Sequence, residues 1–465
     1  MREETSDVLV IGAGPGGLSA AAAAADAGAR VTVVDENTAP GGQIYRQPPD
    51  GFVGGRAAAG RDRDRGRALL RQASHPLVKL TLDTTAWGSF EPGTVETLGP
   101  DGAKRLRAGV LILSTGAYDR SVALPGWTLP GVFSVGGAQA LLKGQHVIPE
   151  GRVFLAGTGP LLLVVASQLV GAGADVVGVA DAVSTGRALR VGGWDLLHGR
   201  GLLLDGASYR ASLIRARVPW HAPAIPIAIG GRDRVESVTI ARVDESWTPV
   251  PGTERTVPTD VVCLGFGLVP STEFLRLLGC QLSYQTTTGL FEPVRSEDFE
   301  TSVRNVFAVG DGTRIAGAIV AAHEGRIAGL AAAARLNLLS PDEAVSRSVA
   351  ARQELERLAK FTAAIERMYA PREGLMSLAE ATTVVCRCED VTRADIEGAL
   401  GDGAMTLQQV KSWTRAGMGP CQGRMCELNV VALTARRLGL VAEAIGPLSA
   451  RPPVKPVALG DLAAE

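Results

Sequence analysis

The chain contains 465 residues, enough for about three domains of roughly 150 residues each. Hydrophobic residues make up 46% and charged residues 20% of the chain, which is typical of a globular protein and excludes a disordered chain or a coiled coil. With 47 basic and 48 acidic residues the net charge is −1, so the summed charge recruits neither nucleic acid nor an anionic membrane.

The first ten residues, MREETSDVLV, lack the basic segment and the uninterrupted apolar run of a secretory signal, so we expect a cytoplasmic protein. The longest apolar stretch, residues 161–180, is interrupted near its centre by Gln168, Gly171, Gly173 and Asp175. No membrane-spanning helix is expected there.

The N-terminal segment has the pattern of a nucleotide-binding βαβ unit. The apolar run at 7–11 predicts a strand, GAGPGG a tight turn, the alanine-rich stretch 18–27 a helix, and 30–34 a second strand that ends in Asp35. This order of strand, glycine turn, helix and strand is the one that binds dinucleotides.

Each glycine of the G-x-G-x-x-G motif has its own task in such a unit. Gly12 permits the turn, Gly14 lets the backbone approach a pyrophosphate, and Gly17 lets the helix pack closely on the strand. Unpaired N–H groups and the helix dipole then favour the pyrophosphate at the helix N-terminus. Asp35 is placed to accept hydrogen bonds from a ribose diol, with Glu36 as the alternative. A glycine turn that serves packing alone is the competing interpretation.

Residues 153–181 repeat this pattern about 145 residues later and end in Asp181. Two copies predict an α/β fold with two Rossmann-like dinucleotide-binding domains. Gly157 and Gly159 are present, but Leu162 takes the third glycine position, where its side chain would separate helix from strand and weaken the pyrophosphate site. Asp181 would suit an adenosine ribose and repel a 2′-phosphate, which favours NAD, ADP or ATP over NADP. A vestigial site kept for packing is the alternative.

Two further predicted strands, at 110–114 and 306–309, end in turns that are candidate cofactor contacts. The turn residues are Thr115 and Gly116 after the first strand, and Gly310 and Asp311 after the second. A helix of small residues begins near Gly317, so an N-cap role for Asp311 is the alternative.

Beyond residue 340 the pattern changes. Residues 341–369 are polar, with apolar residues at helical spacing, and predict a connecting helix that packs on the rest of the molecule rather than on a partner. The tail 451–465 is proline-rich and is expected to be extended.

Four cysteines gather in the last eighty residues, with the spacing C-x-C, thirty-two residues, then C-x4-C. They are Cys386, Cys388, Cys421 and Cys426. Four thiolates brought together bind zinc or an iron–sulfur cluster. Zinc modules favour C-x2-C pairs, whereas a binuclear cluster tolerates other spacings, so we favour [2Fe–2S] and keep zinc and free thiols as alternatives. Glycines 417, 419 and 423 leave backbone N–H groups free to bond sulfur.

The first glycine motif and the two strand ends together resemble the two-dinucleotide-binding flavoproteins. The resemblance implies that Thr115 and Gly116 lie against the dinucleotide and that Asp311 binds the flavin ribityl chain. Disulfide reductases of this fold place two cysteines beside the flavin, but residues 40–50 and 130–145 contain none, so no dithiol relay is expected. The two remaining cysteines, Cys263 and Cys280, are predicted to be core residues.

A closer resemblance rests on GGQIYRQ at 41–47, TGAYDR at 115–120, LPGWTLPGV at 124–132 and AGTGPLLL at 156–163. Together these segments resemble the B subunit of hydrogen cyanide synthase and the A or α subunits of opine oxidases and of heteromeric proline or hydroxyproline dehydrogenases, over about residues 5–440. The candidate cofactor contacts in the first segment are Gly42, Gln43 and Arg46. The cysteine segment resembles the bacterioferritin-associated-ferredoxin type of [2Fe–2S] domain.

The resemblance implies FAD and [2Fe–2S] as cofactors. It also implies a hetero-oligomer with a β subunit similar to FAD-dependent amino-acid oxidases. As in some relatives, FMN at a subunit interface or a small ferredoxin-like subunit would be a further component. The expected domains are FAD-binding at 1–125 and 285–340, NAD(P)-binding-like at 126–284, a helical linker at 341–380, a small helical [2Fe–2S] domain at 381–450, and the tail at 451–465.

Flavins accept two electrons and can release them singly, while a [2Fe–2S] cluster carries one. No acid–base constellation for a substrate is visible, so we expect electrons to arrive from another protein. The predicted function is the electron-transferring α subunit of a heteromeric dehydrogenase that acts on the C–N bond of an amino acid, imino acid or opine, and that meets a membrane only through its electron acceptor. The alternatives are a self-contained NAD(P)H-dependent reductase of an electron carrier and a non-catalytic structural subunit.

Overall fold

β1 lies inside the largest sheet of the computed structural model, which describes residues 2–48 and 61–463. The sheet order is β3-β2-β1-β6-β5-β4, with β19 paired to β6. The strands are β1 (Arg2–Ile11), β2 (Val31–Val34), β3 (Val78–Thr81), β4 (Thr85–Gly88), β5 (Thr94–Gly99), β6 (Gly102–Leu113) and β19 (Val306–Ala308). β1 is parallel to both β2 and β6, as the predicted βαβ unit requires.

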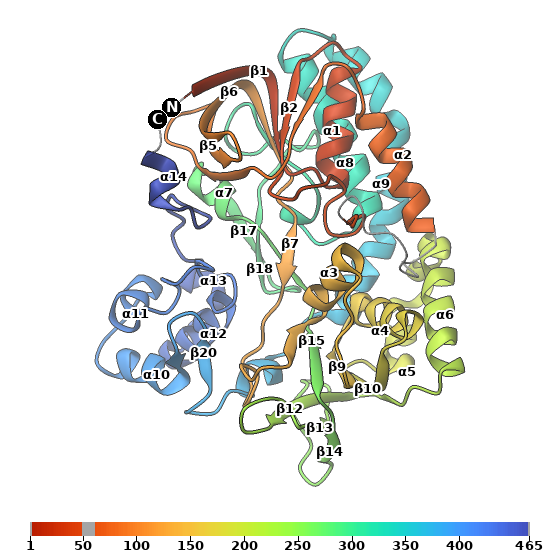
Figure 1. The fold of residues 1–465 in the computed structure, drawn as a ribbon, viewed down its shortest axis with the longest axis vertical. Coiled ribbons are helices and arrows are strands. Elements are labelled where there is room, and N and C mark those ends of the chain that lie inside the picture. Colours follow the sequence, from red (N-terminus) through yellow and green to blue (C-terminus); the bar gives the residue numbers. More distant parts are fainter. Residues whose placement is uncertain (1, 49–60, 464–465) are drawn as a thin grey trace.

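Two helices of small residues cover this sheet, α1 (Pro15–Ala25) and α8 (Ala318–Arg335), while α2 (Arg61–Ala73) lies beside α1 (Figure 1). α1 and α8 approach so closely that a Cβ on Gly325 would lie 2.0 Å from the Gly16 carbonyl oxygen, and one on Gly329 would lie 2.3 Å from that of Ala20. The alanine and glycine content of both helices therefore reflects this contact.

The second sheet has the order β11-β10-β9-β15-β8, with all strands parallel. Its strands are β8 (Val132–Ser134), β9 (Arg152–Gly157), β10 (Asp175–Asp181), β11 (Trp220–His221) and β15 (Val261–Gly265). The helices of this domain are α3 (Val135–Gln145), α4 (Pro160–Ala172), α5 (Thr185–Gly192), the 3-10 helix η1 (Gly193–Gly199) and α6 (Arg200–Arg215). The second βαβ unit, β9-α4-β10, is therefore confirmed.

Short antiparallel elements complete this half of the molecule. They are the three-stranded sheet of β12 (Ala224–Gly230), β13 (Ser237–Arg242) and β14 (Arg255–Pro258), the pair β7 (Ala117–Asp119) and β16 (Leu268–Pro270), the hairpin β17 (Leu282–Gln285) and β18 (Leu290–Pro293), and helix α7 (Glu273–Leu277). The β7–β16 pair lies where the chain passes between the two parallel sheets.

α9 (Pro341–Tyr369) is the predicted connecting helix. It begins at Pro341, and the hydroxyl of its N-cap Ser340 accepts the Glu343 N–H group. The helix packs first on α8 and then on α5 and η1, where Phe361 and Met368 meet Leu196. The prediction that this helix packs within the molecule is confirmed.

A smaller helical domain follows the 3-10 helix η3 (Glu373–Ser377) and lies to one side of both sheets (Figure 1). Its elements are β20 (Val384–Cys386), β21 (Val391–Thr392), α10 (Arg393–Gly401), α11 (Leu407–Thr414), α12 (Glu427–Leu438) and α13 (Ala442–Ile445). Its apolar residues join those of the second sheet domain in one continuous core. The domain is therefore docked rather than loosely tethered.

The tail returns to the first sheet. Val454 is buried there and donates its N–H to the Trp87 carbonyl, while the Lys455 ammonium contacts the Glu36 carboxylate at 2.7 Å. Leu459–Ala463 then form a short helix, α14, so the prediction of a wholly extended tail is wrong for these residues. Within the described residues no helix is both long and apolar enough to cross a membrane.

Candidate cofactor sites

The turn between β1 and α1 accepts only glycine at two of its three motif positions. Gly12 has a φ of +105°, and a Cβ there would lie 2.2 Å from the Ser114 carbonyl oxygen, while one on Gly17 would lie 1.9 Å from that of Gly12. α1 begins with Gly14 as N-cap and Pro15 after it, and no side chain caps the helix. The first-turn N–H groups therefore stay available for an anion, as the sequence predicts.

The segment that follows β2 closes over this turn. Gly42 has a φ of +61°, and a Cβ there would lie 2.9 Å from the Gly14 Cα. Arg46 donates to the side-chain oxygens of Gln43 and Asn37, both at 3.0 Å. The Arg46 Nε–H is buried and has no acceptor among residues 2–48 and 61–463. A buried donor without a partner beside the glycine turn fits a ligand that supplies acceptor atoms.

Asp35 is buried, and its carboxylate accepts hydrogen bonds from within the protein. One carboxylate oxygen accepts the Ala13 N–H at 2.6 Å, and the other accepts the N–H and the side-chain amide of Asn37 at 2.8 and 2.7 Å. The Glu36 carboxylate is more exposed and is held by Lys455. Asp35 thus ties the glycine turn to β2.

Two turns that lie about 195 residues apart in the sequence meet at the end of β6 and β19. A Cβ on Gly312 would lie 2.6 Å from the Thr115 hydroxyl oxygen and 3.0 Å from the Gly116 nitrogen. The Thr115 hydroxyl donates to the Ser271 carbonyl at 2.8 Å. The turns predicted at 115–116 and 310–311 are therefore in direct contact.

Asp311 closes the loop that leads into α8. Its Oδ1 accepts the N–H groups of Ala316 and Gly317, both at 2.9 Å, whereas its Oδ2 has no hydrogen bond within the described residues. Burial raises the pKa of this carboxyl above its usual range. The helix N-cap itself is Gly317, so the simple capping alternative for Asp311 does not hold.

Glu324 is a positioning residue that the sequence did not reveal. Its carboxylate accepts the Gly310 N–H at 2.7 Å and pairs with Arg295 at 3.1 Å, and both side chains are largely buried. Arg295 also donates to the Ala308 carbonyl at 2.9 Å. The only signal in the sequence is a carboxylate within a helix of small residues, next to His323. His323 itself has Glu354 and Arg357 of α9 as its charged neighbours.

The four C-terminal cysteines come together in two thiol pairs, Cys386 with Cys426 and Cys388 with Cys421. The Cys426 thiol and nearby backbone N–H groups lower the pKa of Cys386 to about 6. A Cβ on Gly419 would lie 2.2 Å from the Cys388 Cβ, so glycine lets this loop close over the thiol. Among the described residues, no three His, Cys, Asp or Glu side chains are grouped to hold one metal ion.

Cys263 and Cys280 are buried in separate clusters, as predicted for core residues. Burial raises the pKa of Cys263 to about 12 and also raises that of Cys280, so neither thiol is poised to react.

The second glycine turn differs from the first. A Cβ on Gly157 would lie 1.8 Å from the Gly265 carbonyl oxygen, and Gly159 faces open space, but Leu162 is fully buried in the core of the sheet domain. Asp181 accepts the Val183 N–H at 3.0 Å, and burial raises its pKa to about 7. The Asp181 carboxyl is thus enclosed by the protein. A cavity of about 360 Å³ lies nearby, beside Trp220 and His221.

The strap formed by residues 115–127 links the two candidate sites. It begins at Thr115, and Asn429 of α12 donates to the Ser121 carbonyl at 3.0 Å and accepts the Ala123 N–H at 3.3 Å. Trp127 donates its indole N–H to the Val384 carbonyl at 2.6 Å. Asn429 is three residues after Cys426, and Val384 is two residues before Cys386.

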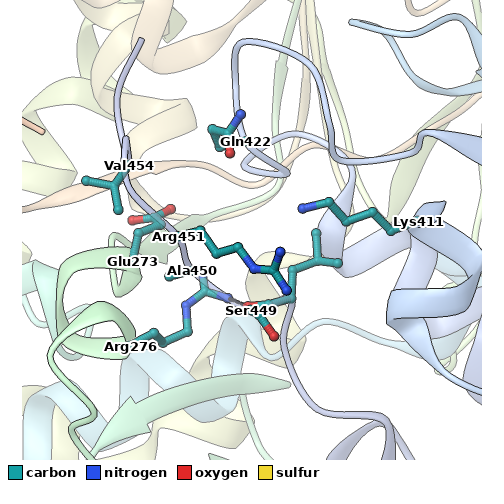
Figure 2. Close-up of a pocket in the computed structure, with 9 residues that line it drawn as sticks. Glu273, Arg276, Lys411, Gln422, Ser449, Ala450, Arg451 and Val454 are labelled. Atoms are coloured by element: carbon teal, nitrogen blue, oxygen red, sulfur yellow. Dashed lines mark hydrogen bonds between the residues drawn. The ribbon is translucent and has the colours of Figure 1, made fainter. Parts of the chain in front are cut away.

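Ion pairs also join α7 to the cysteine domain, beside a small pocket lined by Glu273, Arg276 and Lys411 (Figure 2). Arg276 of α7 pairs with Glu427 at 3.1 Å and donates to the Leu448 carbonyl at 2.6 Å, and Arg424 pairs with Glu273 at 3.1 Å. The pocket between them measures about 10 Å³, room for one water molecule. These contacts fasten the cysteine domain rather than form a substrate site.

Comparison with known proteins agrees with this architecture. Residues 6–325 match the pyridine nucleotide-disulphide oxidoreductase family, and residues 380–465 match the sarcosine oxidase A3 domain. The chain is 35% identical to the A subunit of opine oxidase from Agrobacterium tumefaciens (strain Ach5), over 98% of this chain and 91% of the relative. The chain belongs to the family of opine oxidase A subunits.

Other similarities extend the picture. The HcnB subunit of hydrogen cyanide synthase from Pseudomonas aeruginosa is 34% identical over 90% of each chain. The crystal structure of L-proline dehydrogenase from P. horikoshii superposes with a TM-score of 0.71 and 20% identity over all of this chain and 80% of that one, which shows a shared fold. The family resemblance expected from the four short segments is confirmed, and so is the expectation of an oxidoreductase subunit. The match of the cysteine domain to the ferredoxin type stays a prediction.

Proposed function

We propose that this chain is the electron-transferring subunit of a heteromeric dehydrogenase that oxidises the C–N bond of an amino acid, imino acid or opine. The observation that carries the proposal is the strap 115–127, which starts at the candidate flavin turn and ends in hydrogen bonds beside Cys386 and Cys426. The relatives that support it are named as subunits of opine oxidase and of hydrogen cyanide synthase.

The first site fits FAD. Gly12 and Gly14 would receive the pyrophosphate at the α1 N-terminus, and Asp35, with Glu36 as the alternative, would accept hydrogen bonds from the ribose. The unpartnered Arg46 Nε–H and the free Asp311 oxygen Oδ2 supply a donor and an acceptor that the described protein does not satisfy. Glycines on both sides of the turn leave no Cβ in the way of the ligand.

The second site fits [2Fe–2S] better than zinc. A zinc ion needs four ligands around one point, whereas a binuclear cluster takes two thiolates on each of two irons. The thiols form two hydrogen-bonded pairs, Cys386 with Cys426 and Cys388 with Cys421, which suits two thiolates on each iron. Backbone N–H groups of Gly417, Cys388 and Glu389 point at the Cys386 sulfur, as hydrogen bonds to cluster sulfurs require.

When bound, FAD would supply two-electron chemistry and the cluster one-electron transfer. Asp311 and the α8 N-terminus would orient the flavin, and Asn429 holds the strap against the cysteine domain. Substrate oxidation would take place on a β subunit similar to FAD-dependent amino-acid oxidases. FMN at the subunit interface or a small ferredoxin-like subunit would be further components.

Anaerobic reduction tests this proposal. The complex of this chain with its β subunit should lose flavin absorbance on addition of an amino acid, imino acid or opine, and iron reduction should follow. The isolated chain, with flavin and iron counted after acid extraction, should not respond to NADH. Bleaching of the flavin by NADH alone would instead favour the self-contained reductase. The proposal would be refuted if none of the amine or imino substrates tested bleached the flavin of the complex.

A further inference from the structure

The consecutive elements α5, η1 and α6 expose large apolar side chains to solvent. The exposed fractions are 64% for Leu189, 85% for Trp194, 42% for Leu197 and 66% for Leu204. Single exposed leucines are ordinary, but four large apolar side chains within sixteen residues mark a contact surface.

These side chains form one face. Their sequence neighbours Val191, Leu196 and Leu202 pack inward on the cluster that contains Phe361 and Met368 of α9. The three elements follow one another without a linker and α9 lies behind them, so the exposed residues point away from α9. Figure 1 shows α6 at the outer edge of the molecule, on the side opposite α10–α13.

The same face is strongly basic. Residues 185–217 contain six arginines and two aspartates, a net charge of +4, although the whole chain has a net charge of −1. The exposed arginines are Arg190, Arg200, Arg215 and Arg217, and no ion pair holds them within the described part of the chain. Asp195 pairs with Arg367 at 2.8 Å, and neither aspartate is fully exposed. The leucine–arginine face, comprising these four arginines and the four apolar residues above, is thus basic in sum, although the exposed Glu245 carboxylate lies 4.0 Å from Arg187 of α5 and the Asp195 side chain is partly exposed.

We propose that the leucine–arginine face docks the protein on an anionic phospholipid surface. Tryptophan and leucine side chains enter the headgroup region, and guanidinium groups bind lipid phosphates. Each arginine near an anionic surface strengthens binding about fivefold. The net charge of the chain does not reveal this basic face, because acidic residues elsewhere in the chain balance its positive charge.

A second copy of the chain is a poorer occupant. In a symmetric contact between two copies the same patch meets itself, which would bring its four exposed arginines against the same arginines of the second copy. An anionic membrane offers both an apolar interior for the exposed tryptophan and leucines and negatively charged headgroups for the arginines. The docking is peripheral, since it involves surface side chains alone.

Flotation with vesicles tests the proposal on the full-length chain. The protein should bind vesicles of equal parts phosphatidylglycerol and phosphatidylcholine, bind pure phosphatidylcholine far more weakly, and dissociate as salt rises. The double variant Arg190→Ser/Arg200→Ser should bind about 25-fold more weakly, from about fivefold per arginine. Trp194→Ser/Leu197→Ser should lose at least about tenfold.

Trp413→Ser is the matched control, because Trp413 is 52% exposed on α11 of the cysteine domain, away from the proposed face. It should bind vesicles like the parent protein, and all variants should keep the parent circular dichroism spectrum. The proposal is overturned if the parent chain does not bind anionic vesicles, or if Trp413→Ser weakens binding as much as Trp194→Ser/Leu197→Ser.

Two further results would also overturn it. One is a concentration-dependent dimer in sedimentation that Trp194→Ser abolishes, which would assign the face to self-association. The other is hydrogen-exchange protection of residues 189–204 in the complex with the β subunit without lipid, which would assign the face to that subunit.

Discussion

The buried pair of Glu324 and Arg295 should control the stability of the turn that carries Asp311. Replacing Glu324 by alanine leaves the Arg295 guanidinium, which is 13% exposed, with the Ala308 carbonyl as its remaining hydrogen-bond acceptor among the described residues. It also leaves the Gly310 N–H without its acceptor at 2.7 Å. The perturbation therefore creates one uncompensated buried charge and one unsatisfied donor.

The magnitude follows from these two losses. Removing one partner of a buried ion pair costs about 3–5 kcal/mol, and this range already includes much of the cost of an orphaned donor. We expect Glu324→Ala to lower the free energy of unfolding by about 4 kcal/mol. Glu324→Gln keeps an acceptor for Gly310 and should cost about half as much. The double variant Glu324→Ala/Arg295→Ala should cost about 1–3 kcal/mol less than the sum of the single changes, because no unpaired charge remains.

Urea unfolding of the parent, both single alanine variants and the double variant measures these values. Hydrogen exchange at residues 306–317 should show that Glu324→Ala opens this turn first. The flavin content of Glu324→Ala should fall as this turn opens. Glu324→Gln should retain most of the parent's flavin content. A cost below about 1 kcal/mol for Glu324→Ala, or strictly additive single variants, would refute the buried-pair argument.

Three other predictions concern separate sites. Gly42→Ala places a Cβ 2.9 Å from the Gly14 Cα at a residue with positive φ, so flavin affinity should fall at least about tenfold in a fluorescence titration. The control is Gly171→Ala in α4, where the added Cβ faces open space, and this variant should bind flavin normally. Burial raises the pKa of Asp181 to about 7, so its ionisation destabilises the fold as pH rises from about 4 to 7. Denaturation should find Asp181→Asn more stable than the parent by up to about 4 kcal/mol at pH 8, and the gain should vanish near pH 4; a constant gain would refute this pKa. Cys421→Ser should lose iron by chemical assay, keep flavin and partner binding, and stop electron transfer to the acceptor, whereas unchanged turnover per complex would support the non-catalytic alternative.

Local pattern was sufficient for the elements that are built from neighbouring residues. Both βαβ units, the helix at 341–369 and the turns after β6 and β19 were predictable because strand and helix periods, glycine turns and proline stops act over a few residues. The cysteine spacing likewise identified four thiols that the fold brings together. The tail was misjudged at 459–463 because its proline-rich start says little about the residues that follow.

The tertiary structure decided what these residues meet. The sequence predicts Asp35 as a ribose ligand, and the fold adds hydrogen bonds to it from Ala13 and Asn37. It also places Glu36 beside Lys455, 419 residues away in the sequence. The Glu324–Arg295 pair and the continuous core shared by the second sheet and the cysteine domain also join distant segments. No local period encodes such contacts, since each depends on where packing of the apolar faces brings the chain.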